Sequence, residues 1–512
     1  MSLTTLPATP LAEVYDVAVI GGGINGVGIA ADAAGRGLSV FLCEKDDLAS
    51  HTSSASSKLI HGGLRYLEHY EFRLVREALA EREVLLAKAP HIVKPMRFVL
   101  PHRPHLRPAW MIRAGLFLYD HLGKREKLAG STSLKFGTDS PLKAEITKGF
   151  EYSDCWVDDA RLVVLNAMAA REKGAHVHTQ TRCVGARRSK GLWELNLERA
   201  DGSLFSIRAK ALVNAAGPWV AKFIKDDLKL DSPYGIRLIQ GSHLIVPKLY
   251  DAPNAFILQN EDQRIVFTIP YMDQFTIIGT TDREYTGDPA KVSITEQETD
   301  YLLNVVNAHF KQQVSRADIL RTYSGVRPLC NDESDNPSAV TRDYTLALSG
   351  VPGEAPLLSV FGGKLTTYRK LAESAMAQLT PYFTQIKPSW TAKATLPGGE
   401  NMTTPQALSA ALTSKYNWLD AAIAKRWAIT YGSRSWNLLD GAQGLDDMGE
   451  HIGSGLYSRE VDYLCTQEWA LDAQDILWRR TKLGLFTTAQ EQEHLAQYMA
   501  TLDLKHRKVA AA

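Results

Sequence analysis

Four residues near the start of the chain are spaced for binding a dinucleotide. Gly21, Gly23 and Gly26 form a G-x-G-x-x-G loop, and Glu44 lies eighteen residues beyond the last glycine. Gly21 permits a tight turn, Gly23 lets the backbone approach a pyrophosphate, and Gly26 lets a helix pack closely on a strand. The carboxylate of Glu44 is suited to accept hydrogen bonds from ribose hydroxyls. The spacing predicts a dinucleotide site; a glycine-rich turn that binds nothing is the alternative.

Four cationic side chains lie beside motif glycines or in loops near this predicted site: Arg65, Arg327, Arg342 and Lys364. A guanidinium group gives paired, charge-assisted hydrogen bonds to a phosphomonoester, and a lysine adds a point charge. These side chains therefore suit a substrate that carries a phosphate. The alternative is that they are surface residues or ion-pair partners, as most arginines are.

Two histidines are candidates for the base that removes a hydroxyl proton. His61 lies in a Gly-Gly segment, and His243 lies at the start of a β-rich run. An imidazole titrates near neutral pH, so either ring could accept a proton. A histidine is more often a structural hydrogen-bonding group than a catalyst, and that alternative stays open for both. Cys155 and Cys330 are expected to be buried thiols without a redox role.

The segments around these residues predict a Rossmann-type fold. Residues 17–20 and 38–43 are short apolar runs typical of buried parallel strands, and the small-residue segment 27–34 between them is expected to be a helix. Residues 211–217 and 357–361 have the same character, and each runs into a glycine turn. The nucleotide fold is therefore expected to be interrupted and then resumed.

The interrupting residues predict a sheet that covers the substrate. Three β-rich runs, 242–246, 264–269 and 274–280, are separated by polar turns, as in an antiparallel meander. Beyond about residue 397 helical spacing dominates, as in 457–482. The predicted fold class is α/β: a Rossmann-type domain with an inserted mixed or antiparallel β-sheet domain and a C-terminal helical domain.

The predicted domain boundaries follow these segments. They are 1–80, 155–235 and 320–390 for the nucleotide domain, 81–154 and 236–319 for the substrate domain, and 398–512 for the helical domain.

The composition excludes several function classes. The 58 basic and 57 acidic side chains leave a formal net charge of +1, which gives no overall electrostatic attraction for nucleic acid. The five cysteines are scattered and odd in number, as suits a reducing compartment. Neither a signal peptide nor a run of roughly 20 apolar residues is recognisable. We expect a cytoplasmic protein with no nucleic-acid partner and no metal site.

Three longer motifs are more specific than the fold signature. They are TSSASSKLIHGGLRYL at 52–67, YSGVRPL at 323–329 and FGGKLTTYR at 361–369. Together they closely resemble motifs of the aerobic, FAD-dependent glycerol-3-phosphate dehydrogenases of bacteria. The resemblance implies FAD as the cofactor and sn-glycerol 3-phosphate as the substrate.

The resemblance also implies a set of site residues. Around the substrate it places Arg65, Tyr66, Arg327, Arg342 and Lys364, and we assign His243, Arg327 and Lys364 to catalysis. The residues expected to contact FAD are Gly21, Gly23, Gly26, Glu44, Ser53, Ser57, Gly217, Gly362, Gly363 and Thr366. A helix expected to begin near Leu365 would direct its N-terminus at the charge that reduced flavin develops. A simple capped helix is the alternative.

For the reaction, the resemblance implies oxidation to dihydroxyacetone phosphate by hydride transfer from C2 to N5 of FAD. It further implies that electrons pass to ubiquinone at the cytoplasmic face of the inner membrane; a homodimer is also expected. Residues 91–127 suit such a surface, because eight Lys or Arg and two Asp or Glu are interleaved with bulky apolar side chains. A partly buried helix with a solvated basic face is the alternative.

Three competing functions remain open at this point. A flavin oxidase of the same fold would pass electrons to dioxygen. A non-redox nucleotide-binding or RNA-modifying protein conflicts with the balanced charge. A soluble NAD enzyme would need no phosphate-binding cations near a flavin.

Overall fold

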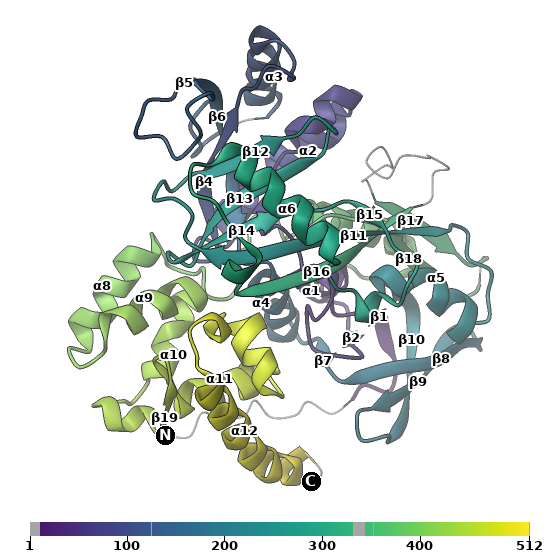
Figure 1. Ribbon diagram of the computed structural model, residues 1–512. Helices are drawn as coiled ribbons and strands as arrows, with labels where there is room; N and C mark the ends of the chain where they lie inside the picture. The colour runs from purple at the N-terminus through teal and green to yellow at the C-terminus, as the bar shows by residue number, and fades with distance from the viewer. Residues whose placement is uncertain (1–10, 124, 331–343, 352, 511–512) are drawn as a thin grey trace.

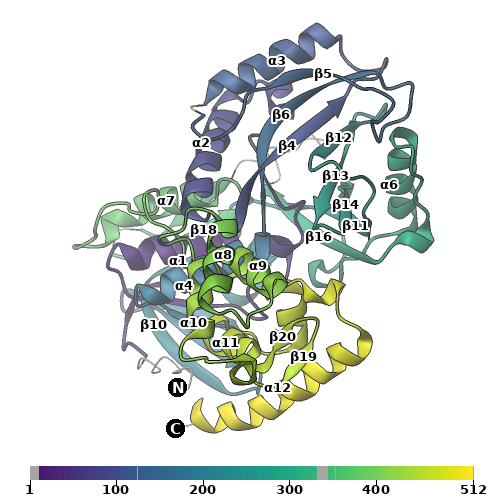
Figure 2. The same cartoon turned by 90° about the vertical axis from the view of Figure 1, so that its left-hand side faces the viewer.

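The computed structural model describes residues 11–123, 125–330, 344–351 and 353–510. In Figure 1 one β-sheet lies above the other, and the C-terminal helices lie at the lower left, below the upper sheet and beside the lower one. Figure 2 shows the same arrangement from the side, with the upper sheet at the top and the C-terminal helices below it. This architecture agrees with the predicted fold class.

Among the described residues the first sheet has eight strands, and its centre is parallel in the order β18-β10-β1-β2-β7. Strands β17, β8 and β9 extend it by antiparallel pairing. The eight strands are β1 (Tyr15–Ile20), β2 (Val40–Cys43), β7 (His176–His178), β8 (Thr181–Ser189), β9 (Leu192–Arg199), β10 (Leu204–Asn214), β17 (Thr345–Ser349) and β18 (Leu357–Phe361).

Side chains of β1 are buried on both faces of the first sheet, and three helices cover one of these faces. Val17 and Val19 pack into a core with α1 (Ile24–Gly35), α4 (Asp159–Glu172) and α7 (Tyr368–Leu379). The intervening residues of β1 face the opposite side, where the β8–β9 hairpin covers them. Successive side chains of a strand point to opposite faces, so a strand buried on both faces is apolar throughout.

The second sheet, as far as the structure describes the chain, has ten strands and is antiparallel except where β12 pairs with β4. Its strands are β3 (Leu59–Ile60), β4 (Val93–Pro101), β5 (Thr132–Lys135), β6 (Lys148–Val157), β11 (Ile236–Pro247), β12 (Ala255–Gln259), β13 (Ile265–Tyr271), β14 (Phe275–Gly279), β15 (Arg283–Glu284) and β16 (Arg321–Cys330). Helices α2 (Phe72–Lys88) and α3 (Ala109–Leu122) cover one face and α6 (Glu296–His309) the other. The predicted runs 242–246, 264–269 and 274–280 are β11, β13 and β14, which pair antiparallel in the order β11-β14-β13. Strand β12, which pairs with β13, was not predicted.

Three features of the fold differ from the expectations. Strand β3 lies in the segment 1–80, which we expected to belong to the nucleotide domain, yet it pairs with β6 in the second sheet. Strand β16 lies in the segment 320–390, which we expected to belong to the nucleotide domain, yet it pairs with β11 in the second sheet. The helix expected from Leu365 begins at Tyr368, because the preceding residues form a turn after the glycines. The predicted domain boundaries themselves stay a prediction.

The C-terminal domain is helical apart from one short hairpin, β19 (His451–Gly453) with β20 (Leu456–Tyr457). Its helices are α8 (Pro405–Lys415), α9 (Ala421–Thr430), α10 (Ser435–Leu439), α11 (Ser458–Glu468) and α12 (Ala489–Ala510). A separate apolar core holds them together, with Trp427 and Leu464 among its fully buried members.

Buried ion pairs join this C-terminal domain to the first sheet. Arg161 at the start of α4 donates two hydrogen bonds to the carboxylate of Glu468, one of them 2.9 Å long. Arg480 donates at 2.8 and 2.7 Å to the two oxygens of Asp47, which follows β2. All four side chains are at most 3% exposed. Removing one member of such a pair leaves its partner charged and dehydrated.

We therefore expect Arg161→Met to lower the free energy of unfolding by about 3–5 kcal/mol, because Glu468 would lose its cationic partner inside the protein. Chemical denaturation of the purified variants measures this. Arg187→Met is the matched control, since Arg187 is 80% exposed and pairs with Glu194 on the surface. Equal destabilisation by both substitutions would contradict the assignment.

Candidate active site

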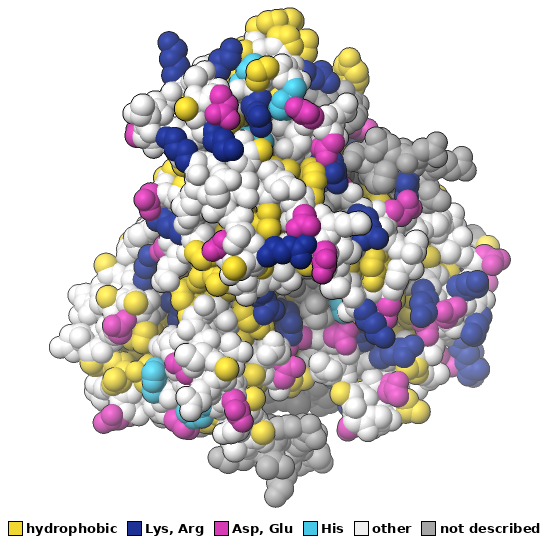
Figure 3. Space-filling view, viewed as in Figure 1, with side chains coloured by type: hydrophobic (Ala, Val, Ile, Leu, Met, Phe, Trp, Pro, Cys, Tyr) yellow, Lys and Arg dark blue, Asp and Glu magenta, His cyan; other side chains and the backbone are white. Residues whose placement is uncertain are grey.

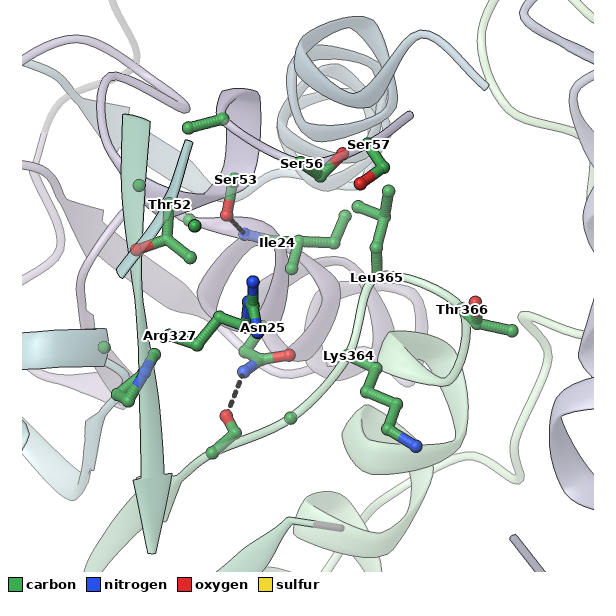
Figure 4. Close-up of a pocket in the computed structure, with 18 of the residues that line it drawn as sticks. Ile24, Asn25, Thr52, Ser53, Ser56, Ser57, Arg327, Lys364, Leu365 and Thr366 are labelled. Atoms are coloured by element: carbon green, nitrogen blue, oxygen red, sulfur yellow. Dashed lines mark hydrogen bonds between the residues drawn. The ribbon is translucent and has the colours of Figure 1, made fainter. Parts of the chain in front are cut away.

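A cavity of about 300 Å³ lies where the glycine loops of the first sheet meet β11 and β16 of the second. Figure 4 shows side chains from α1, from residues 52–57, from β16 and from the loop after β18 around it. Its lining includes Gly23, Ile24, Asn25, Ser53, Ser57, His61, Tyr66, Gly217, Gly241, His243, Arg327, Gly362, Gly363, Lys364 and Thr366.

The glycine loop after β1 leaves no room for side chains. A Cβ on Gly26 would lie 1.9 Å from the carbonyl oxygen of Gly21, and a Cβ on Gly21 would lie 2.4 Å from that of Ala215. Gly21 also has a φ of +111°, which favours glycine. As a result, α1 begins directly at the cavity, where the backbone N–H of Ile24 donates to Ser53 Oγ at 3.0 Å. Backbone N–H groups at a helix start attract phosphate.

Glu44 holds the glycine loop. Its carboxylate accepts hydrogen bonds from the backbone N–H groups of Gly22 at 2.6 Å and Asp46 at 2.9 Å. Burial raises the pKa of this carboxyl, and the two N–H groups act against that rise. Glu44 is outside the lining of the cavity, so its predicted role toward a ribose stays a prediction.

A second glycine turn, after β18, faces the start of α1. Gly362 and Gly363 have φ angles of +79° and +103°. The Asn25 amide nitrogen Nδ2 donates to the Gly362 carbonyl at 3.1 Å, whereas Asn25 Oδ1 is buried and has no hydrogen-bond partner among the described residues. Asn25 was not predicted from the sequence, although its position as a polar residue between Gly23 and Gly26 could have indicated a role at the site.

Arg327 reaches the cavity across the second sheet. Its guanidinium pairs with Asp282 and donates through Nη2 to the carbonyl of Thr281 at 3.1 Å. Gly241 on β11 makes room, since a Cβ there would lie 2.4 Å from Arg327 Nη2. Asp282 lies 45 residues from Arg327 in the chain, and nothing in its local sequence marked it.

The other predicted substrate residues are only partly placed. Lys364 and Tyr66 come together, with Nζ 4.0 Å from the centre of the tyrosine ring. Arg65 is in the short helix Leu64–His69, but its side chain is not described, and Arg342 lies outside the described residues. Thr366 Oγ1 accepts a hydrogen bond from the backbone N–H of His61 at 3.3 Å.

His243 is the buried histidine of the cavity. Its Nε2 lies 2.9 Å from Ser57 Oγ, and its ring stacks on Tyr323 with 4.6 Å between ring centres. A Cβ on Gly279 would collide with the imidazole, so that glycine provides its space. Burial, and then the charges of Lys58 and Arg327, hold the pKa of His243 well below its usual range. The ring is therefore neutral at pH 7 and able to accept a proton.

These residues fit FAD. The helix start offers N–H groups for a pyrophosphate, the two glycine turns allow close approach, and the buried Asn25 Oδ1 lacks a donor among the described residues. Comparison with known proteins points the same way: the family described as "FAD dependent oxidoreductase" matches residues 16–369, and "C-terminal domain of alpha-glycerophosphate oxidase" matches residues 389–506.

Individual relatives are more specific. A glycerol-3-phosphate dehydrogenase of Pseudomonas tolaasii is 80% identical, with both chains fully covered. The aerobic glycerol-3-phosphate dehydrogenase of Escherichia coli is 61% identical over 95% of this chain and 97% of its own. The chain belongs to the FAD-dependent glycerol-3-phosphate dehydrogenases.

The solved structure of a Bacillus halodurans glycerol-3-phosphate dehydrogenase with FAD agrees with this membership. It matches with a TM-score of 0.76 at 28% identity, over 96% of this chain and 90% of that one. The resemblance inferred from the three motifs is thereby confirmed, and so are FAD as cofactor and the fold class. The roles assigned to individual site residues stay predictions.

For a glycerol-3-phosphate dehydrogenase built this way, Gly26→Ala should abolish FAD binding, because the new Cβ would displace Gly21 and the start of α1. Flavin absorbance per protein after purification measures this. Acid precipitation should release the flavin of the unaltered protein, since we expect it to be noncovalent. Gly115→Ala is the matched control, because nothing lies within 4 Å of a Cβ there; normal flavin content in Gly26→Ala would refute the assignment.

Proposed function

We propose that this protein oxidises sn-glycerol 3-phosphate to dihydroxyacetone phosphate and passes the electrons to ubiquinone. The observation that carries the proposal is one cavity in which two cations, Arg327 and Lys364, and a neutral imidazole, His243, border the glycine loops. A substrate held by its phosphate would present its hydroxyl to a proton acceptor. Relatives named glycerol-3-phosphate dehydrogenase support the same substrate.

FAD, when bound, supplies the two-electron acceptor for the hydride from C2 of the substrate. We expect the loop at Gly23, Asn25 and Ser53 to hold its pyrophosphate, and the turn at Gly362 and Gly363 to border its ring system.

Recognition of the phosphate falls to the cations. Asp282 and the Thr281 carbonyl fix part of the Arg327 guanidinium, which orients its remaining donors. Lys364, which lies against the Tyr66 ring, adds a second positive charge. An anchored dianion limits the orientations of the three-carbon substrate, and restricted orientation lowers the barrier to reaction.

Proton removal falls to His243 in this proposal. Its imidazole accepts the hydroxyl proton as the C2 hydride leaves, so the substrate loses one proton and one hydride. Ser57 and Tyr323 fix the ring from two sides. His61 also lines the cavity and is the second candidate for this role.

The surface around α3 supports ubiquinone as the acceptor. Trp110 and Phe117 are 70% and 58% exposed, and Arg107 lies exposed beside them. In Figures 1 and 3 this helix forms the top of the molecule, where yellow and dark blue side chains gather. Among the described residues, none of the helices is long and apolar enough to cross a bilayer. An exposed apolar and basic surface suits an anionic membrane, where quinone is dissolved.

Dioxygen is the alternative acceptor, favoured by the match of residues 389–506 to a domain of alpha-glycerophosphate oxidase. Turnover with a soluble quinone analogue in the absence of oxygen supports the dehydrogenase. Peroxide formed at the rate of substrate loss in air, with no quinone reduction, supports the oxidase.

Arg327→Ala should lower kcat/KM for glycerol 3-phosphate by roughly 10- to 150-fold, because a charged hydrogen bond is worth about 1.5–3 kcal/mol. Arg327→Lys should recover only part, since lysine keeps the charge but loses the planar fork. Steady-state kinetics at matched flavin content measures both. Glycerol lacks the phosphate, so its slow turnover is the control; equal losses for both substrates would mean that Arg327 supports the fold instead.

A triple variant with Arg103, Arg107 and Arg113 changed to Glu should float less with anionic vesicles than the unaltered protein does. Salt should weaken the binding of the unaltered protein to these vesicles, because it screens the charges. The matched control reverses three exposed arginines of the β8–β9 hairpin, Arg182, Arg187 and Arg199, and changes the net charge equally. Equal flotation of both triple variants would rule out α3 as the docking surface.

A further inference from the structure

Four charged side chains cluster behind the Ser57–His243 pair, at the N-terminus of α4. They are Lys58, Asp158, Asp159 and Lys482; three are at most 5% exposed and Asp158 is partly buried. They come from three parts of the fold: Lys58 from the segment before β3, Asp158 and Asp159 from the start of α4, and Lys482 from the C-terminal domain. Nothing in the proposed function so far uses them.

The charges pair across these boundaries. Lys58 Nζ donates to Asp159 Oδ1 at 2.7 Å, and Lys482 Nζ donates to Asp158 Oδ1 at 2.8 Å. Two adjacent aspartates would repel each other, but the two ammonium groups and the positive end of α4 offset that repulsion. Removing either lysine leaves the cluster with a net negative charge.

Asp159 connects the cluster to the active site. Its Oδ2 accepts hydrogen bonds from the backbone N–H of Ser56 at 3.2 Å and from Ser56 Oγ at 2.7 Å. Ser56 Oγ in turn accepts from the backbone N–H of Lys58 at 2.9 Å. Both neighbours of Ser57 are therefore tied to Asp159, while Ser57 itself meets His243. Figure 4 shows Ser56 and Ser57 side by side at the cavity.

The same segment holds the second neighbour of the imidazole. The Tyr323 hydroxyl donates to the Ser56 carbonyl at 3.0 Å, and the Tyr323 ring stacks on His243 with an interplanar angle of 9°. Lys58 Nζ lies 5.3 Å from the centre of that ring. One anchored segment thus sets both the hydroxyl that His243 meets and the ring against which it lies.

We propose that Lys58, Asp159 and Lys482 are positioning residues for His243. Asp159 fixes residues 56–58 so that Ser57 and Tyr323 orient the imidazole, Lys58 contributes the charge next to it, and Lys482 extends the arrangement into the C-terminal domain. The inference rests on the proposed role of His243 as proton acceptor. It gives residues 398–512 a part in the reaction.

A purely stabilising role is the competing account. Buried ion pairs add little net stability, because the cost of removing two ions from water offsets their attraction. The groups that face His243 are Lys58, Tyr323 and Arg327, with Asp158, Asp159, Tyr271 and Lys482 behind them. Because Lys58 helps to lower the pKa of His243, loss of its charge should raise that pKa. A pair that only stabilises the fold would leave kcat per bound flavin unchanged.

The kinetic test compares Lys58→Met, Lys58→Arg and Lys482→Met per bound flavin. In Lys58→Met we expect kcat to fall by about 10-fold or more, because a small misplacement of a reacting group can cost up to about 100-fold, with a smaller change in KM. The acid limb of the pH profile should move to higher pH, because a raised pKa leaves less neutral His243 in acid. Lys58→Arg should keep the limb in place and recover most of kcat. Lys482→Met should move the limb in the same direction by less.

Lys425→Met is the matched control. Lys425 also joins the C-terminal domain to the rest of the chain, donating to Asp273 at 2.7 Å, but it is 62% exposed. Its substitution removes a cross-domain lysine–aspartate pair without touching Asp158 or Asp159, so it should change neither kcat nor the limb.

A second measurement does not depend on turnover. In protein labelled with ¹³C-histidine, NMR follows the titration of His243, whose signal is the one missing in His243→Asn. The titration of His243 should move to higher pH in Lys58→Met and in Lys482→Met. If Lys58→Met does not fold, the titration in Lys482→Met is the test of the inference. The inference would be overturned if neither the His243 titration nor the acid limb moved in the Lys→Met variants. It would also be overturned if kcat of Lys58→Arg were as low as kcat of Lys58→Met. Failure of the unaltered protein to oxidise glycerol 3-phosphate would instead overturn the proposed function, and the NMR titration would still test the cluster.

Discussion

The close approach of α1 to the loop after β1 is the contact on which the rest of the site depends. Only a residue without a side chain fits at Gly26, because the carbonyl of Gly21 lies where a Cβ would be. With that contact made, the start of α1 lies at the carboxyl ends of β1 and β10, the edge at which ligands bind in such sheets. The turn after β18 then meets Asn25, and β11 and β16 close the other side of the cavity.

Much of this could be predicted from the sequence, where the constraint is local. Gly21 needs its positive φ and Gly26 needs the absence of a side chain wherever the chain folds, and the apolar runs 17–20 and 38–43 are typical of buried strands. Pairings between distant residues could not be predicted. Ser57 and His243 are 186 residues apart, and Asp282 meets Arg327 through the register of separate strands. The type of a residue indicates which chemistry its side chain can perform, whereas the tertiary structure determines which groups that side chain contacts.

Strand β16 shows why the sheet to which a segment belongs was hard to predict. Its sequence contains Gly325 and Pro328, which interrupt the apolar run expected of a central strand. Proline is tolerated at a sheet edge, where its missing N–H is not needed, and among the described strands β16 pairs with β11 alone. Similarly, two threonines and a glycine turn before Tyr368 delay the start of α7. The sequence therefore indicated a helix at α7, but not the residue at which α7 begins or the sheet that β16 joins.

The interleaving of the two sheets also governs how the chain can fold as it is synthesised. β1 pairs with β10, and β10 pairs with β18, so the parallel sheet cannot close until residues near 361 have left the ribosome. Completion of the second sheet is delayed in the same way, because β3 and β16 are separated by more than 250 residues. Pairing over such distances is slow and leaves strand edges open in the meantime. The apolar surface of α3 is made early in this period, which gives the nascent chain a need for protection by chaperones long before its cofactor site exists.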